Sequence, residues 1–411
     1  MDLPERMQAV TLSGAGEDHL RLSDVPVPRP GPGQLLVRVD AAGICASLIK
    51  TIDQGADHAY FHGWDLGAHP AILGDEGSVT IAAVGRDLTG AYRLGDRYVV
   101  QPAVDHGPVN HLERYRGHGR GVRKIACGYT LPGHLAGYML IPEEVLLAKC
   151  LLPVPDPEMA HAHAAIAEPI SCCVSGQFHH VHLSQDALTS PRQARAGLKR
   201  DGVTVVVGLG AMGRMHVEVA LAAGGGTVIG SDPSDSRRAR TEVLFTHRAD
   251  AAGGRLLTAT PERVADVVAQ ASDGRGADDL IVAVGAAPVI EASLPLLAKG
   301  GVANLFGGLK AGQDQIRIDA NAVHYGETCI TGSSGGTAWD VAQTLDWMHR
   351  GRIHAAPHIA KIGGLDQALE LIDDVRHQRL DGKAVLYPHR PVDAAFEVDG
   401  WTAADEARHL A

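Results

Sequence analysis

Three short segments of the sequence carry side chains that could do chemistry together. They lie at 43–47, 73–77 and 167–169. Their thiol and carboxyl groups are Cys45, Asp75, Glu76 and Glu168. Zn²⁺ accepts thiolate sulfur and carboxylate oxygen in tetrahedral sites, and a catalytic site leaves one position open for substrate. Each segment also has an ordinary structural interpretation, as a packed thiol, a turn and a helix boundary. The residue types therefore indicate a metal site, and the spacing alone leaves those structural roles open.

A second chemical feature is a glycine-rich turn that follows the apolar run 203–207. The sequence there is Gly208-Leu209-Gly210-Ala211-Met212-Gly213, and a helix-like segment follows it. In a dinucleotide site the first glycine allows a tight turn, the second lets the backbone approach a pyrophosphate, and the third lets the helix pack closely on the strand. The expected cofactor-binding residues are Gly208, Gly210, Ala211, Met212, Gly213, Asp232 and Arg237.

Asp232 indicates which dinucleotide the turn would hold. It lies 19 residues after Gly213, at the end of the next apolar run. A carboxylate at that position can accept a hydrogen bond from the ribose 2′-hydroxyl, which favours NAD. Arg237 and Arg238 follow closely enough to reach a 2′-phosphate, so NADP stays open, as does a Rossmann-like turn that holds no cofactor.

Two types of region would have to position these residues. The N-terminal part has short alternating runs such as 34–39 and 78–84, punctuated by Gly and Pro, which predict a β-rich domain. From about residue 200, strand-like and helix-like segments alternate, which predicts a doubly wound parallel sheet of the Rossmann type. The chain is thus expected to be α/β. The segment 184–200 is expected to cross between the domains as a loop or helix.

Composition excludes several classes of protein. The 411-residue chain has a formal net charge of −11 and no long basic block, which argues against a nucleic-acid partner. Its start lacks the features of a signal peptide, and no apolar run approaches the roughly 18 residues of a membrane helix. The six cysteines form no CxxC pairs. With 22 histidines in the chain, some histidines are expected to lie close together in the sequence by chance, and His179-His180 is interpreted as such a pair. A cytoplasmic protein acting on small molecules is the simplest expectation.

The order of the motifs resembles a known family. Gly-Ile-Cys-x-Ser, Gly-x-Glu-Gly, Leu-Gly-Asp-Arg at 94–97, Glu-Pro and Gly-x-Gly-x-x-Gly follow one another. This order resembles the zinc-dependent medium-chain dehydrogenase/reductase superfamily over about residues 7–388. Val323-His324-Tyr325 and the glycines of 332–336 are similar to the sorbitol dehydrogenase and sorbose-1-phosphate reductase branch.

The resemblance implies a domain organisation and an assembly. A β-rich GroES-like catalytic domain would comprise residues 1–177 and 330–390, an NAD-binding Rossmann domain 178–329, and a C-terminal tail 391–411. The resemblance also implies a homodimer or homotetramer.

The resemblance gives each site residue a role. Cys45 would be the thiolate ligand, Asp75 would occupy the position usually held by a ligand His, and Glu76 would be the adjacent carboxylate. Glu168 would be a further or exchanging ligand. Ser47 would relay the proton of an alcohol substrate.

Four departures from the family pattern stand out. Asp75 replaces a nitrogen ligand by an oxygen, which makes the ligand set harder and more negative. Leu48 and Lys50 stand where relatives usually carry Asp and His, so the relay would be shortened to Ser47 or use Lys50. One of the intervening histidines could supply a nitrogen ligand instead: His58, His62 or His69. The lobe that often holds a four-cysteine zinc is replaced by 105–129, which contains only Cys127, so no structural zinc is expected.

The replaced lobe is also the one basic loop of the chain. Its arginine and lysine residues are Arg114, Arg116, Arg120, Arg123 and Lys124. Charge runs of this kind usually lie on a solvated surface. An anion-binding role, for a substrate phosphate or a partner subunit, is the alternative because arginine binds such groups through two hydrogen bonds.

The whole pattern predicts a zinc-dependent oxidoreductase that transfers hydride between NAD and a secondary hydroxyl or ketone. The implied substrate is a polyol, cyclitol or sugar, including phosphorylated forms. Other functions stay open: an epimerase or lyase that uses tightly bound NAD for transient oxidation, a metal-free reductase, or a non-enzymatic NAD-responsive interaction protein. Fold alone does not decide among them.

Overall fold

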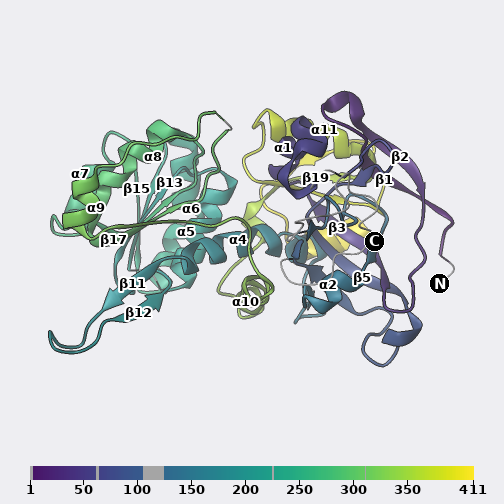
Figure 1. The fold of residues 1–411 in the computed structure, drawn as a ribbon, viewed down its shortest axis with the longest axis horizontal. Helices are drawn as coiled ribbons and strands as arrows, with labels where there is room; N and C mark the ends of the chain where they lie inside the picture. Colours follow the sequence, from purple (N-terminus) through teal and green to yellow (C-terminus); the bar gives the residue numbers. More distant parts are fainter. Residues whose placement is uncertain (1–2, 62–63, 105–124, 225, 311) are drawn as a thin grey trace. The chain divides into compact units, whose positions relative to one another are not determined.

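The computed structural model describes residues 3–61, 64–104, 125–224, 226–310 and 312–411 (Figure 1). The chain divides into unit 1, Met1–Pro169 with Thr337–Ala411, and unit 2, Ile170–Gly336. The boundaries expected from the sequence are 177/178 and 329/330, and both observed boundaries, 169/170 and 336/337, differ from them. The first boundary differs because the helix α4 (Ala167–Phe178) begins in unit 1 and continues into unit 2, so no loop separates the two.

Unit 1 is built on an antiparallel β framework. Its eight-stranded sheet has the order β10-β6-β5-β3-β20-β19-β21, with β9 also paired to β3 and with one parallel pair, β19 with β20. The strands of this sheet are β3 (Leu35–Gly43), β5 (Glu76–Val84), β6 (Arg97–Val100), β9 (Tyr138–Ile141), β10 (Leu151–Pro153), β19 (Ile359–Gly364), β20 (Lys383–Tyr387) and β21 (Phe396–Glu397). Two smaller sheets are formed by the strands β1 (Arg6–Leu12), β2 (Leu20–Pro26) and β4 (Ala71–Ile72), and by the strands β7 (Ala103–Val104) and β8 (Ile125–Ala126). A buried aliphatic core, which includes Val37, Val39 and Leu386, lies against these strands.

The helices of unit 1 are short and lie around the sheet. They are α1 (Ser47–Gln54), α2 (Glu143–Leu147), α3 (His161–Ala165), α10 (Ala338–His349), α11 (Ala368–Arg376) and α12 (Ala403–Leu410). The last of them differs from the expected polar tail. Glu406 of α12 is buried and accepts hydrogen bonds from the main-chain N–H groups of His161 and Ala162 at 2.6 and 2.8 Å. Its carboxylate thereby stabilises the N-terminus of α3, which fixes the C-terminal segment on unit 1.

Unit 2 contains a six-stranded, wholly parallel sheet in the order β15-β14-β13-β16-β17-β18. Its strands are β13 (Val203–Val207), β14 (Thr227–Ser231), β15 (Arg255–Ala259), β16 (Ala277–Val282), β17 (Leu297–Leu305) and β18 (Cys329–Gly332). Its helices are α5 (Ala211–Ala222), α6 (Asp235–Ala251), α7 (Val264–Ala271), α8 (Ala287–Ser293) and α9 (Ala320–Gly326). This strand order is that of a doubly wound nucleotide-binding sheet, so the expected fold class is confirmed.

A β-hairpin replaces the crossing segment that the sequence analysis expected at 184–200. Its strands are β11 (Val181–Ser184) and β12 (Gln193–Ala196), paired antiparallel. Figure 1 shows the hairpin extending from unit 2 beyond the parallel sheet. Within the described ranges, no helix combines the length and apolar character that a membrane crossing requires.

Candidate functional site

Three of the predicted ligand residues come together in unit 1. Cys45 follows β3, Asp75 precedes β5, and Glu76 begins β5. Their ligand atoms all lie within 4.8 Å of one another. The antiparallel pairing of β3 with β5 places Gly43 opposite Glu76. A Cβ atom at Gly43 would lie 2.1 Å from Glu76 Oε2, so a glycine is needed there to leave room for the carboxylate.

Two oxygens of this cluster lack hydrogen-bond partners. Asp75 Oδ1 and Glu76 Oε2 are buried, and neither accepts a hydrogen bond from the part of the chain that the structure describes. The other Asp75 oxygen, Oδ2, accepts a hydrogen bond from Ser47 Oγ at 2.7 Å. The main-chain N–H of Ser47 donates to Cys45 Sγ at 3.4 Å. A buried oxygen without a partner is costly, so the cluster is suited to bind a further group.

Lys383, which the sequence analysis did not select, holds one side of the cluster. It begins β20, is almost fully buried, and donates from Nζ to Glu76 Oε1 at 2.5 Å and to the carbonyl oxygen of Ile44 at 3.0 Å. Burial disfavours its charge, but the Glu76 carboxylate and the Cys45 thiol outweigh burial and raise the pKa of Lys383. The available signal was a lysine at the head of the apolar run 384–386.

The charge of the cluster favours a cation. Burial, followed by the charges of Asp75 and Glu76, raises the pKa of the Cys45 thiol well above its ordinary value. Burial also raises the pKa of Asp75 and of Glu76, although Ser47 and Lys383 respectively oppose the shift. One thiol and two carboxyl groups face one ammonium group. The donor set and its two unpartnered oxygens fit a Zn²⁺ ion, which accepts sulfur and oxygen ligands.

Glu168, Leu48 and Lys50 are not members of this group of three ligand residues. Glu168 is buried in the first turn of α4, and its charge contributes to the raised pKa of Cys45. It does not belong to the group of ligand atoms within 4.8 Å. Leu48 is buried in the core of unit 1, whereas Lys50 is exposed.

An aromatic group borders the cluster. The Tyr129 ring stacks on His58 at 5.2 Å and contacts Tyr60 and Phe61 edge to face. Burial and the charge of Asp75 raise the pKa of Tyr129, which was also missed from the sequence. Neither His58 nor His69 lies in a group of residues that could hold a metal ion, as far as the described chain shows. His62 and the basic residues of 105–124 lie outside the described residues.

The glycine turn in unit 2 has the local geometry that a dinucleotide site needs. Gly208 has φ of 91°, which favours glycine. A Cβ atom at Gly213 would lie 1.7 Å from the carbonyl oxygen of Gly208, whereas a Cβ atom at Gly210 would meet nothing within 4 Å. Gly213 thus permits close packing of α5, whose first residues are Ala211 and Met212, and Gly210 leaves its surroundings open.

Asp232 lies directly beneath this turn, after β14. Its Oδ2 accepts a hydrogen bond from the main-chain N–H of Leu209 at 2.8 Å, and its Oδ1 accepts one from Ser234 N at 2.8 Å. Each carboxylate oxygen can accept a second hydrogen bond, which leaves capacity for a ribose hydroxyl. Arg237 Nη1 lies 3.7 Å from Asp232 Oδ2. The carboxylate is therefore oriented by the turn and has a cation beside it.

Unit 2 holds a second group of potential ligands, His180, His182 and Asp279, of which only His180 belongs to the histidine pair that was expected to be a chance cluster. Asp279 Oδ1 lies 2.6 Å from His180 Nδ1 and 2.8 Å from His182 Nε2. Asp279 Oδ2 accepts a hydrogen bond from Lys199 N at 2.8 Å. Burial opposes ionisation of Asp279, but the hydrogen bonds from both histidines outweigh it and lower the pKa of Asp279. Both oxygens of this carboxylate are therefore already satisfied.

Family models and known proteins agree with this architecture. The model of the alcohol dehydrogenase GroES-like domain matches residues 31–156, and that of the zinc-binding dehydrogenase matches residues 211–350. The chain belongs to the zinc-dependent medium-chain dehydrogenase/reductase superfamily, as expected, and is an oxidoreductase of the alcohol dehydrogenase class.

Individual relatives cover almost the whole chain. A mannitol-1-phosphate 5-dehydrogenase of Aliivibrio fischeri is 28% identical over 388 residues, 91% of this chain and 85% of the relative. An L-sorbose 1-phosphate reductase of Klebsiella pneumoniae is 27% identical over 403 residues, 96% of this chain and 92% of the relative. The crystal structure of a protein from Sinorhizobium meliloti, described as a zinc-binding dehydrogenase bound to NADP, superposes with a TM-score of 0.71 at 24% identity. That match covers 94% of this chain and all of the other.

Proposed function

We propose that the chain is a zinc-dependent dehydrogenase or reductase that transfers hydride between NAD and a secondary hydroxyl or ketone of a polyol, cyclitol or sugar. Phosphorylated substrates are included, because relatives along nearly the full length are named for mannitol 1-phosphate and sorbose 1-phosphate. The observation that carries the proposal is the cluster of Cys45, Asp75 and Glu76 with its two unpartnered buried oxygens.

The cluster supplies the ligands, and Ser47 supplies the path for the proton. Cys45, Asp75 and Glu76 would hold one zinc per chain, and Glu168 would be an exchanging ligand. When bound, the metal polarises the substrate oxygen and lowers the pKa of the alcohol. The Ser47 hydroxyl donates to Asp75 Oδ2 and retains lone pairs that can accept the alcohol proton. Ser47 would thus orient the hydroxyl of the substrate and accept its proton at Oγ while its own hydroxyl proton passes to Asp75 Oδ2, so that the serine stays neutral.

Unit 2 would bind the dinucleotide. The amide groups at the start of α5 would face the pyrophosphate, and Asp232 would accept a hydrogen bond from the adenosine ribose. We propose NAD in preference to NADP because both Asp232 oxygens are held in place by main-chain N–H groups at 2.8 Å. The neighbouring Arg237 is the residue that would have to turn toward a 2′-phosphate.

The class of the enzyme and its cysteines support a proposal for its cellular location and its oligomeric state. No disulfide joins any of the six cysteines, all of which lie within the described residues, and this accords with a reducing compartment, so we propose a cytoplasmic location. We propose a homodimer or homotetramer with one catalytic zinc and no structural zinc in each chain.

Metal content and net cofactor reduction test the proposal together. Plasma mass spectrometry of the purified protein should find about one zinc per chain, lost in Cys45→Ala and in Asp75→Ala. The zinc-loaded protein should then produce NADH from at least one member of a panel of polyols and polyol phosphates. Metal-free wild-type protein would contradict the proposed centre, and turnover without net NADH would indicate an epimerase or lyase.

A further inference from the structure

The hairpin of unit 2 has its polar and apolar faces in an unusual arrangement. The register pairs Val181 with Ala196 and Leu183 with Ala194, whereas His182 is paired with Arg195. Side chains alternate between the two faces of a strand, so Val181, Leu183, Ala194 and Ala196 share one face of the hairpin. All four are exposed, and Leu183 is 69% exposed. An antiparallel hairpin normally packs such a face on the core and turns its polar face to water.

The other face of the hairpin is fixed to unit 2. His182 Nε2 bonds the fully buried Asp279, and the main-chain N–H of Gly197, just after β12, donates to the carbonyl oxygen of His180 at 2.9 Å. Turning the hairpin over would remove His182 from Asp279 and leave a buried carboxylate short of a partner. The polar contact therefore holds the apolar face outward.

The hairpin tip adds a further apolar side chain. Leu188 in the connecting loop is 97% exposed. Two-stranded hairpins are marginally stable without packing on one face, and here the apolar face has no packing partner within the described chain. An extended arm with an uncovered apolar face and tip marks a protein-binding surface.

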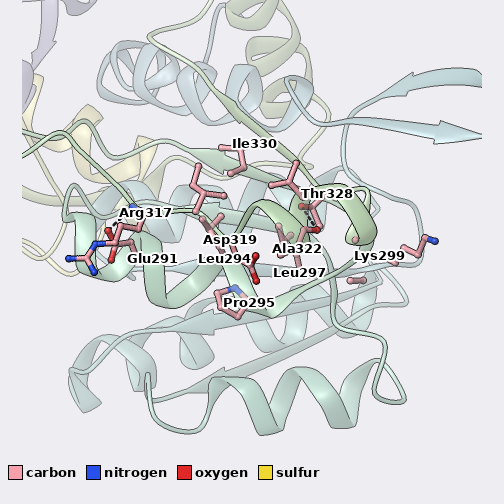
Figure 2. Close-up of a pocket in the computed structure, with 14 residues that line it drawn as sticks. Glu291, Leu294, Pro295, Leu297, Lys299, Arg317, Asp319, Ala322, Thr328 and Ile330 are labelled. Carbon is pink, nitrogen blue, oxygen red and sulfur yellow. Dashed lines mark hydrogen bonds between the residues drawn. The ribbon is translucent and has the colours of Figure 1, made fainter.

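A second copy of the same chain is complementary to this surface in charge and offers an apolar surface of its own. The segment 181–200 carries four basic residues and one acidic residue, within a chain of net charge −11, so a second copy attracts it. Unit 2 also has an uncovered apolar groove of about 320 Å³ (Figure 2). Its apolar lining includes Leu294, Pro295, Leu297, Ala322, Val323 and Ile330.

The groove lies in the part of unit 2 that includes β17 and the edge strand β18, and β11 packs against β17. Each copy thus offers both an apolar arm and an apolar groove. A reciprocal contact about a two-fold axis needs such a pair of surfaces on each subunit.

We propose that the β11–β12 hairpin is an assembly arm whose outward face, with Leu188, packs on a second copy of this chain. The arm gives the proposed homo-oligomer a defined contact, and it is independent of the redox chemistry. Metal content and NADH production, measured on the same samples, report on the proposed function separately from assembly.

Sedimentation velocity of the full chain tests the arm. Leu188→Asp and the double variant Leu183→Asp/Leu188→Asp should each weaken self-association by at least about tenfold or reduce the mass of the assembly. Val243→Asp is the matched control, because Val243 of α6 is 82% exposed in the same unit and is not part of the arm.

The single variant Leu188→Asp tests assembly with the smallest effect on folding. Leu188 is almost wholly exposed, so Leu188→Asp should keep the thermal midpoint of the wild type and separates assembly from folding. A wild-type protein that stays monomeric at all concentrations would overturn the proposal. So would an assembly whose mass and dissociation constant are the same in the wild type, the control and both arm variants.

Discussion

Each unit contains a cluster of three residues that could bind a metal ion. The two clusters differ in whether the carboxylate oxygens already accept hydrogen bonds. Cys45, Asp75 and Glu76 leave two carboxylate oxygens buried without partners. In the cluster of His180, His182 and Asp279, both Asp279 oxygens accept hydrogen bonds. The one buried atom of this cluster without a partner among the described residues is Nε2 of His180. Convergence of ligand atoms alone therefore does not identify a binding site.

The pKa values of the two aspartates, Asp75 and Asp279, are shifted in opposite directions, which agrees with the difference in their hydrogen bonds. Burial raises the pKa of Asp75, against the opposing hydrogen bond from Ser47. Burial also disfavours the charge of Asp279, but its two histidine partners lower its pKa overall. The first carboxylate needs a further cation to be stable as an anion, whereas the second already has its partners. We interpret the first cluster as a metal centre and the second as a clamp that holds the hairpin.

Asp75→Asn is expected to have the largest functional effect. Loss of residues that only support metal ligands lowers metal affinity or activity by about 10–100-fold, so loss of a ligand should cost at least about 100-fold in kcat/KM. The variant should lose zinc and keep its fold, because the amide oxygen can still accept the Ser47 hydrogen bond. Metal analysis, NADH kinetics and circular dichroism measure these three properties.

Asp279→Asn is the matched control for that change, since it is the same substitution in the other cluster. It should keep the zinc and the kcat of the wild type. Loss of zinc in Asp279→Asn, or its retention in Asp75→Asn, would reverse the assignment of the two clusters.

Lys383→Met should have the next largest effect, on stability. It leaves the Glu76 carboxylate buried without its ammonium partner, and breaking a buried pair costs about 3–5 kcal/mol. A bound cation would replace part of that lost charge. Urea unfolding should therefore show a smaller loss with zinc than with chelator, and an equal loss in both conditions would argue against zinc beside Glu76.

Asp279→Asn should reduce stability by a smaller amount, about 2–3 kcal/mol. The variant retains an oxygen that can accept from one histidine, but it loses the charge that both hydrogen bonds involve. Urea unfolding at neutral pH measures this loss. An unchanged free energy of unfolding would contradict the role of Asp279 as a clamp.

Local features of the sequence predicted local geometry well. The spacing of Gly208, Gly210 and Gly213 specifies a turn within one β-α connection, because each glycine acts on neighbours a few residues away. The order of the family motifs likewise indicated Cys45, Asp75 and Glu76, since β3 and β5 are adjacent strands.

Partners distant in sequence could not be predicted in the same way. Lys383 is 307 residues from Glu76, and Asp279 is 99 residues from His180. Their contacts depend on strand pairing that a single sequence does not specify. Alternation predicts that a strand has two faces, but it does not say which face lies inward, and the hairpin places its apolar face outward.

The pH dependence of stability gives the smallest but most direct contrast between the two aspartates. The pKa of Asp279 is lower in the folded protein, so its ionisation stabilises the fold above the ordinary value of about 4, and that contribution is lost as pH falls through the folded pKa. The pKa of Asp75 is raised, so its contribution is present at low pH and is lost as pH rises through the folded pKa.

Chelated wild type, Asp75→Asn and Asp279→Asn should therefore give difference curves of opposite slope between about pH 2 and 7, with the Asp279→Asn difference changing below about pH 4 and the Asp75→Asn difference changing above it. Each unit of pKa shift corresponds to about 1.4 kcal/mol. The advantage of the wild type over Asp279→Asn should shrink as the pH falls, whereas its disadvantage relative to Asp75→Asn should grow as the pH rises. Urea unfolding across this range measures both differences, and two slopes of the same sign would mean that the clusters do not differ as described.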